Sequence, residues 1–121
     1  MKKSIIKDKS FAFSLTVIEL YKLLQSKKEF VISKQILRSG RTSIGANINE
    51  ALAAESRADF VHKMAISSKE ARETLYWLEL LEKSQFIVYD YTKYIADCTE
   101  LVKILTSIVK TTKNSKLKTN N

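Results

Sequence analysis

Residues 56–84 read SRADFVHKMAISSKEARETLYWLELLEKS, and this stretch decides the fold. Its apolar side chains recur every three or four residues, which places them on one face of an α-helix. That face comprises Phe60, Met64, Ala71, Leu75, Leu78 and Leu81. Ser56 is a natural N-cap, and Asp59 three residues later gives a weak capping box. The pattern predicts a helix over 57–84 whose single apolar face must pack against other helices.

Three further segments, residues 10–27, 32–55 and 91–112, show the same periodicity. The predicted buried face of the first is Phe11, Leu15, Ile18, Tyr21 and Leu24. The last has Asp90 as its predicted N-cap and a heptad-like face of Tyr91, Tyr94, Ile95, Cys98, Leu101, Val102, Leu105, Ile108 and Val109. A run of small and polar residues over 39–47 interrupts the middle segment. By propensity that run could be a loop; we favour a helix, because a loop would leave two fragments too short to hold a bundle.

The composition also favours long helices. The chain has 121 residues, of which 45% are hydrophobic, with no proline and only two glycines. Proline breaks helix interiors and glycine weakens them, so their scarcity argues against a turn-rich β fold. The connections between the predicted helices are short, which makes neighbouring helices antiparallel. We therefore predict an all-α protein, an antiparallel up-down-up-down four-helix bundle.

The net charge of +8 sits mainly at the two ends of the chain. Residues 1–9 carry a net +3 and residues 110–121 a net +4, which leaves +1 for the rest. Chain ends are often loosely ordered. We expect a basic N-terminal arm over 1–9, the bundle over 10–112 and a flexible, Lys-rich C-terminal tail over 113–121.

Few residues of this chain suit catalysis or metal binding. The single cysteine, Cys98, falls on an apolar helix face, so we expect a buried thiol rather than a nucleophile. His62 is the only histidine, whereas a zinc site needs three or four ligands. No segment has the length and apolar character of a membrane span or a signal peptide. The sequence predicts a cytoplasmic binding protein rather than an enzyme, with no catalytic residues, metal or cofactor and no contact with a membrane.

Basic residues are densest between positions 22 and 41, where Glu29 alone opposes them and the local net charge is +5. They are Lys22, Lys27, Lys28, Lys34, Arg38 and Arg41. With Lys113, Lys116 and Lys118 of the tail, they could form a patch that binds RNA or DNA through its phosphates. The alternative is that these charges serve solubility alone. A different class of function, a protein–protein adaptor with an apolar and aromatic interface, also remains open.

Three smaller groups have both a structural and a functional interpretation. Arg38, Ser43, Asn47 and Glu50 are expected to form an internal polar network, because buried polar groups must be paired; a contact with ligand or RNA is the alternative. Gly40, Gly45 and Ala46 are typical of a close crossing between helices; a site where a phosphate approaches is the alternative, although phosphate loops need a strand-to-helix turn that this sequence lacks. The aromatic residues Tyr76, Trp77 and Tyr94 fit either core packing or an interface between subunits, where aromatic side chains are enriched.

Four stretches resemble the four helix bundle protein family, also known as the 23S ribosomal RNA intervening-sequence proteins. They are KQILRSG at 34–40, TSIGANINEA at 42–51, SRADFVHKMAI at 56–66 and ETLYWLELL at 73–81. The resemblance covers residues 10–88 closely and the last helix in pattern only. It implies an up-down four-helix bundle that can assemble into a five-membered homo-oligomeric ring, and it supplies no catalytic residues. A related branch, the accessory proteins of diversity-generating retroelements, binds nucleic acid and a reverse transcriptase, but no residue here marks that branch.

The chain departs from the family pattern at Arg41. The family runs from the Ser-Gly pair directly to Thr-Ser-Ile, whereas here Arg41 stands between them. One extra residue inside a helix must be absorbed, for instance by a π-bulge. The departure therefore bears on the helix register between Arg38 and Asn47.

Overall fold

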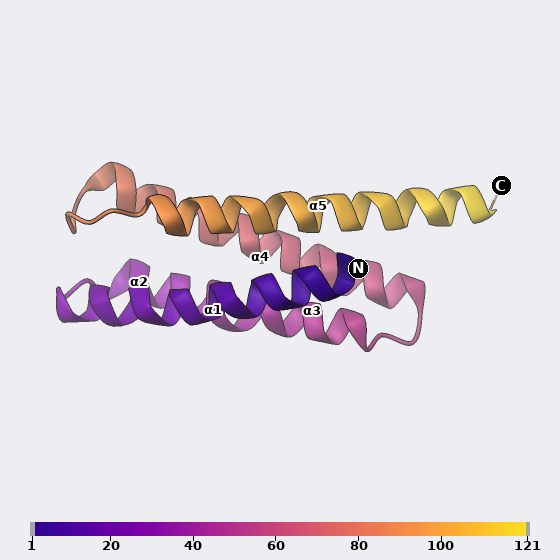
Figure 1. Ribbon diagram of the computed structural model, residues 1–121, viewed down its shortest axis with the longest axis horizontal. Coiled ribbons are helices and arrows are strands. Elements are labelled where there is room, and N and C mark those ends of the chain that lie inside the picture. Colours follow the sequence, from indigo (N-terminus) through magenta and orange to yellow (C-terminus); the bar gives the residue numbers. More distant parts are fainter. Residues whose placement is uncertain (1, 121) are drawn as a thin grey trace.

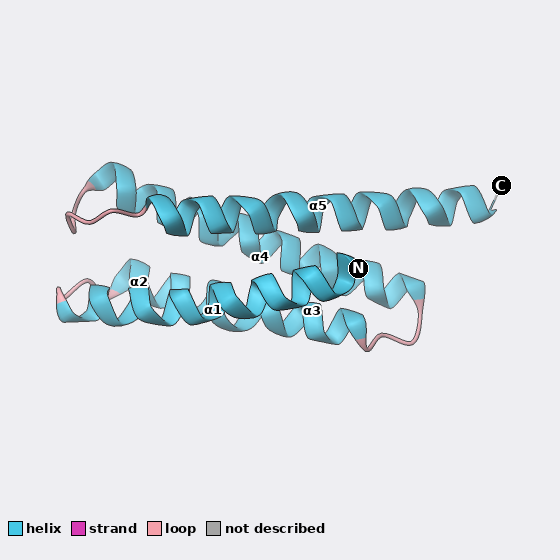
Figure 2. Ribbon diagram, viewed as in Figure 1, coloured by secondary structure: helices cyan, strands magenta, loops and turns pink. Residues whose placement is uncertain are grey.

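The computed structural model describes residues 2–120, with side chains described for residues 5–40 and 43–114. The chain consists of four helical rods (Figures 1 and 2). Their elements are α1 (Lys2–Ser26), then α2 (Val31–Ile36), η1 (Leu37–Ser43) and α3 (Ile44–Leu52) as one continuous rod, then α4 (Arg57–Ser84) and α5 (Thr92–Asn120). No strand occurs within residues 2–120. The predicted all-α helical bundle is confirmed, and the predicted helix over 57–84 matches α4 residue for residue.

The chain reverses direction at each of its three connections (Figure 1). As a result, α1 and α4 run in the same direction, while α5 and the rod made of α2, η1 and α3 run the opposite way. Each of α1 and α4 packs against both of these rods, but the backbones of α1 and α4 do not approach each other closely within the described residues. The rods α1 and α4 therefore stand at opposite corners of the bundle. The start of α1 and the end of α5 both point toward the end of the bundle that carries the α3–α4 connection.

The ends of the chain are more helical than expected. Residues 2–9, expected as a separate arm, form the first turns of α1, and Ile6 is fully buried in the core. At the other end α5 continues to Asn120, so residues 113–120, expected as a flexible tail, extend this helix. None of the described helices is long and apolar enough to cross a membrane.

The buried face of α1 differs from the predicted one. Phe13, Val17 and Leu20 are almost completely buried, whereas Phe11 is 67% exposed and Leu15 is 51% exposed. Of the predicted face, Leu24 alone is fully buried. The prediction was wrong because α1 carries two apolar stripes on different faces, and periodicity alone does not say which stripe faces the core.

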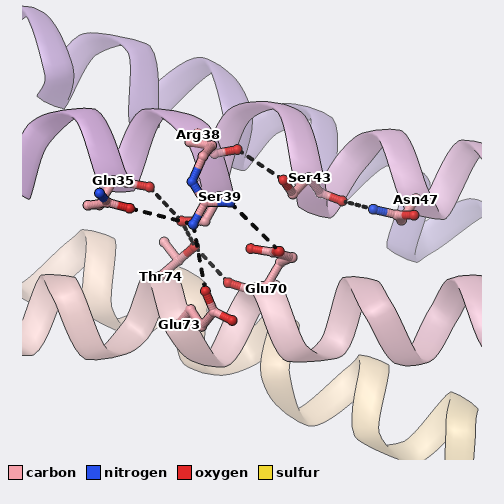
Figure 3. Close-up of polar contacts among 8 residues, drawn as sticks. All are labelled: Gln35, Arg38, Ser39, Ser43, Asn47, Glu70, Glu73 and Thr74. Atoms are coloured by element: carbon pink, nitrogen blue, oxygen red, sulfur yellow. Dashed lines mark hydrogen bonds and ion pairs between the residues drawn. The ribbon is translucent and has the colours of Figure 1, made fainter.

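The rod formed by α2, η1 and α3 contains a wide helical turn. The segment η1 is π-helical over Leu37–Ser43, so the extra residue Arg41 is absorbed as a π-type distortion within a continuous helix. The loop alternative for residues 39–47 is thereby excluded. A buried hydroxyl contact fastens this turn to α4: the Thr74 hydroxyl donates to Ser39 Oγ at 2.6 Å, and the Ser39 hydroxyl donates to the Gln35 carbonyl oxygen at 2.9 Å (Figure 3).

Gly40 allows the wide turn to approach α1 closely. A Cβ atom at this position would lie 2.9 Å from Val17 Cγ2 and 3.4 Å from Thr74 Cγ2, and the first distance is too short for two carbon atoms. The Ser14 hydroxyl of α1 also lies 3.3 Å from the Gly40 carbonyl oxygen. Gly45 is less constrained, because a Cβ atom there would lie 3.6 Å from Ser14 Oγ, an ordinary contact.

We predict that Gly40→Ala and Gly45→Ala change stability in opposite directions. Gly40→Ala should lower the free energy of unfolding by about 1–3 kcal/mol, because the added methyl group overpacks the site against Val17. Gly45→Ala should raise it by up to about 1 kcal/mol, because alanine has the higher helix propensity and the space is available. Urea unfolding followed by circular dichroism measures both. Equal effects of the two substitutions would contradict the close approach at Gly40.

Candidate nucleic-acid interface

Lys27 and Lys28 project from the turn that ends α1. Lys28 has a φ angle of 64°, in the left-handed region that glycine usually occupies at a helix C-terminus. The Glu29 N–H donates to the Leu24 carbonyl at 2.9 Å, and the Lys28 N–H donates to the Gln25 carbonyl at 3.0 Å. These two bonds form a Schellman motif, which stops the helix and reverses the chain. Both lysine side chains are exposed at the resulting tip.

Glu29, the acid that opposes the lysines in sequence, faces inward. Its carboxylate accepts hydrogen bonds from the backbone N–H groups of Val31, Ile32 and Ser33 at 2.7–3.1 Å. Glu29 is only 6% exposed, so the carboxylate caps the N-terminus of α2 rather than covering the lysine ammonium groups. The surface of the turn is consequently more basic than the sequence count implies.

The α4–α5 connection lies at the same end of the bundle as this turn (Figure 1). Burial raises the pKa of Tyr91, and the charge of Glu29 adds to this effect. Large apolar side chains are exposed on both connections. They are Phe30 (47%), Val31 (74%), Phe86 (73%), Val88 (81%) and Tyr89 (41%). We call the surface formed by Lys27, Lys28, Lys34, Phe30, Phe86 and Tyr89 the basic-aromatic end.

Sequence reasoning identified the lysines of this surface but missed Phe30 and Phe86 beside them. Phe86 and Tyr89 belong to the run Phe86-Ile87-Val88-Tyr89, an unusually apolar connection between two helices. This composition was the available signal, because connecting segments on a protein surface are normally polar. Of the four residues of the run, Ile87 alone is buried.

Arg38 and Lys113 do not extend the same surface. Arg38 lies 4.0 Å from Glu70 and 3.8 Å from Glu73 of α4, so its charge is balanced within the bundle (Figure 3). Lys22 is exposed on α1 five positions before Lys27, whereas Lys113 is exposed on the last part of α5, which runs toward the opposite end of the bundle (Figure 1). The side chains of Arg41, Lys116 and Lys118 lie outside the described residues. The structure therefore places Lys113 apart from the patch that the sequence suggested.

The polar network predicted around Arg38 has a different composition. The Ser43 hydroxyl donates to the Arg38 carbonyl oxygen at 3.2 Å, and the Asn47 amide donates to the Ser43 carbonyl oxygen at 2.7 Å (Figure 3). These contacts stay within one rod and do not join its side chains to another helix. Glu50 is exposed on α3. The contacts between helices come instead from Arg38 with Glu70 and Glu73, and from Ser39 with Thr74.

The three aromatic residues predicted for an interface lie in two places. Tyr76 is 59% exposed on the outer face of α4, and its ring meets that of Trp77 edge-on at 5.1 Å. The Trp77 Nε1 atom is buried and has no hydrogen-bond partner within the described residues. Tyr94 lies on α5, half-buried beside Tyr89 at 6.5 Å. Tyr76 and Trp77 therefore share a surface that Tyr94 does not join.

The chemically reactive side chains are poorly placed for catalysis. Cys98 is fully buried, and its thiol lies 3.3 Å from the Ala71 carbonyl oxygen. Burial, with smaller effects from Glu79 and Asp97, raises the pKa of this thiol to about 12. His62 is exposed on α4. Among the residues that the structure describes, no cluster of three or more His, Cys, Asp or Glu side chains could hold a metal ion.

We predict that Cys98 resists alkylation in the folded protein. At pH 8 the raised pKa keeps the thiol protonated, and the thiolate is the reactive form. Iodoacetamide followed by mass spectrometry should show almost no modification in native buffer and complete modification in 6 M guanidinium chloride, a general denaturing condition. Rapid labelling of the native protein would contradict the buried position.

These features define a class of protein. It is an all-α bundle with a buried cysteine, an ion pair of Arg38 with Glu70 and Glu73 between two rods, and an exposed basic-aromatic end. Comparison with known families makes the assignment specific. The profile of the 23S rRNA-intervening sequence protein family matches residues 2–107, and the chain belongs to this family.

A solved structure agrees with this assignment. The chain is 54% identical to a protein of unknown function from the S23 ribosomal protein family of Bacteroides thetaiotaomicron VPI-5482. The two structures match with a TM-score of 0.84 over 91% of this chain and 99% of that one. No curated protein matches the chain significantly.

Proposed function

We propose that this protein binds RNA as a self-associating, non-enzymatic helical bundle, and that the basic-aromatic end makes the contact. The observation that carries the proposal is the combination of exposed lysines and exposed aromatic rings at one end of the bundle. Lysine ammonium groups bind phosphates, and aromatic rings stack on bases. The name of the family, which refers to intervening sequences of 23S rRNA, supports RNA as the nucleic acid.

The chemistry of this end favours unpaired RNA over a duplex. Bases within a duplex are stacked on one another, so an aromatic side chain has little access to them. In a single strand or loop the bases are accessible, and each stacking contact contributes about 1–3 kcal/mol. Phe30 and Phe86, which are 47% and 73% exposed, are the rings best placed to stack.

Self-association would strengthen a weak contact. The three lysines of the basic-aromatic end provide only a few phosphate contacts in one chain. An oligomer that presents this end several times would bind one RNA at several points, and the resulting avidity can exceed the affinity of a single site by orders of magnitude.

The lysines of the basic-aromatic end should dominate the salt dependence of binding. We expect Lys27→Gln/Lys28→Gln/Lys34→Gln to weaken binding of a single-stranded RNA at least tenfold at low salt. The negative slope of the logarithm of the binding constant against the logarithm of salt concentration should become shallower by about 2, because roughly three phosphate contacts are lost. Fluorescence anisotropy across a salt series measures both quantities.

A matched control separates the site from net charge. Lys7→Gln/Lys103→Gln/Lys110→Gln removes the same charge from exposed positions of α1 and α5 away from this end. Its binding should stay within about threefold of wild type, since general electrostatic attraction alone is altered. Equal losses in the two triple variants would refute a localised site.

The aromatic residues should decide the preference for single strands. Phe30→Leu/Phe86→Leu keeps the surface apolar but removes two stacking rings. We expect at least fivefold weaker binding to a single-stranded RNA and little change for a duplex of the same sequence. Val88→Leu, a substitution at an 81% exposed apolar position of the same end, is the control. An identical effect on both RNA forms would argue against stacking.

A protein-binding adaptor is the second candidate, because the same end exposes Val31 and Val88 at 74% and 81%. Apolar contacts strengthen or persist at high salt, whereas phosphate contacts weaken. If RNA affinity is undetectable at low salt and the lysine substitutions change nothing, this second candidate is favoured.

A further inference from the structure

The outer face of α1 carries an apolar pair between two acids. Positions 8, 11, 15 and 19 follow at steps of three and four, so their side chains lie on one face of the helix. Phe11 and Leu15 are 67% and 51% exposed, and the acids Asp8 and Glu19 at either end are exposed as well. This stripe points away from the core that Phe13 and its neighbours enter. A monomer therefore leaves a large apolar surface on α1 in water.

The outer face of α4 carries an apolar pair between two cations. Positions 72, 76, 80 and 83 follow at steps of four, four and three and share one face. Tyr76 and Leu80 are 59% and 38% exposed, and Arg72 and Lys83 at either end are also exposed. Arg72 donates through Nη1 to Ser68 Oγ at 2.8 Å, which holds the guanidinium at the edge of this face.

Beside Tyr76 this face is hollowed. A depression of about 240 Å³ is lined by Lys69, Arg72, Glu73, Tyr76 and Trp77. The one acid among them, Glu73, is outnumbered by Lys69 and Arg72 and lies 3.8 Å from Arg38, which offsets part of its charge. The hollow is therefore basic and aromatic, and it suits a ring side chain that arrives with an acid nearby.

The two faces are complementary in charge and in spacing. Asp8 and Glu19 are eleven positions apart, as are Arg72 and Lys83, which is about 16 Å along a helix. The same steps place the exposed Lys22 beside Glu19 and the exposed Glu79 beside Lys83, so these two charges oppose the pattern at one end of each face. The α1 face carries acids where the α4 face carries cations, and each has two apolar side chains between them. With the two helices parallel, the facing pairs are Asp8 with Arg72, Phe11 with Tyr76, Leu15 with Leu80, and Glu19 with Lys83.

One chain cannot bring these faces together, because α1 and α4 stand at opposite corners of the bundle and both faces are exposed on its outside. We infer that the outer face of α1 docks on the outer face of α4 in a second copy of this chain. The inference rests on the self-association in the proposed function and deepens it by naming both surfaces. The contact joins two different surfaces, so it is head-to-tail and closes into a ring if the rotation between copies allows.

The parallel register has a consequence for the basic-aromatic end. Within one chain α1 and α4 already run in the same direction (Figure 1). When α1 of one copy lies parallel to α4 of the next, every copy points the same way. All basic-aromatic ends then lie on one side of the assembly.

Mixing two variants tests the head-to-tail contact. Phe11→Asp/Leu15→Asp removes the α1 face, and Tyr76→Asp/Leu80→Asp removes the α4 face. Each variant alone should sediment as a monomer of 13.9 kDa at micromolar concentration, where the wild type is oligomeric. An equimolar mixture should form a dimer of one copy of each, because one intact α1 face and one intact α4 face remain.

Charge exchange provides a second test that leaves the apolar side chains in place. Asp8→Lys/Glu19→Lys should weaken self-association at least tenfold, and so should Arg72→Glu/Lys83→Glu. The four substitutions together should restore it. Val88→Asp, at an exposed apolar position outside both faces, should leave the oligomer unchanged. Circular dichroism melts verify that each variant is folded.

Three results would overturn the inference: a monomeric wild type, oligomers that persist in both aspartate variants, or a mixture that stays monomeric. RNA binding, measured in parallel, distinguishes this failure from failure of the proposed function. A wild type that binds single-stranded RNA while its oligomer ignores these faces refutes the docking alone. Loss of oligomer in the face variants, with no RNA binding by the wild type, supports the docking and refutes the RNA role.

Discussion

The bundle depends on the close approach of one helical turn to two neighbouring helices. At Gly40 the wide turn of η1 comes within contact of Val17 on α1, and Ser39 beside it is joined to Thr74 on α4. The lack of a Cβ atom allows the first contact, and the buried pair of hydroxyl groups fixes the second. Together they set the relative position of three of the four rods. The faces that α1 and α4 present to solvent follow from this arrangement.

Sequence periodicity predicted α4 to the residue and located the other rods, because each has a repeating apolar face. It also recognised that Arg41 had to be accommodated within a helix. It failed at α1, whose sequence contains Phe11 and Leu15 on one face and Phe13 and Val17 on another. Choosing between two such faces requires knowing which surface the neighbouring rods cover, and a single helix does not contain that information.

The sequence predicted the lysines of the candidate binding surface but not the aromatic residues Phe30 and Phe86. The lysines are evident from their charge, and in the sequence Glu29 opposes them. In the structure the Glu29 carboxylate caps the start of α2 and does not cover the lysines. Phe30 and Phe86 are 56 positions apart in the chain, and the antiparallel fold places their connections at one end. Arg38 shows the opposite case: its charge suggested phosphate binding, but Glu70 and Glu73 lie beside it. Phe30 and Phe86, like Arg38 and its two glutamates, are far apart in the sequence, so their placement relative to each other cannot be read from the sequence alone.

The direction of the rods also determines where added segments would emerge. The first residues of α1 and the last residues of α5 lie toward the end of the bundle opposite the basic-aromatic end. A fluorescent protein or affinity tag joined to either terminus would therefore stand clear of the lysines and aromatic rings. Immobilisation through such a tag would orient every molecule with this end toward solution, which suits surface-based measurements of binding.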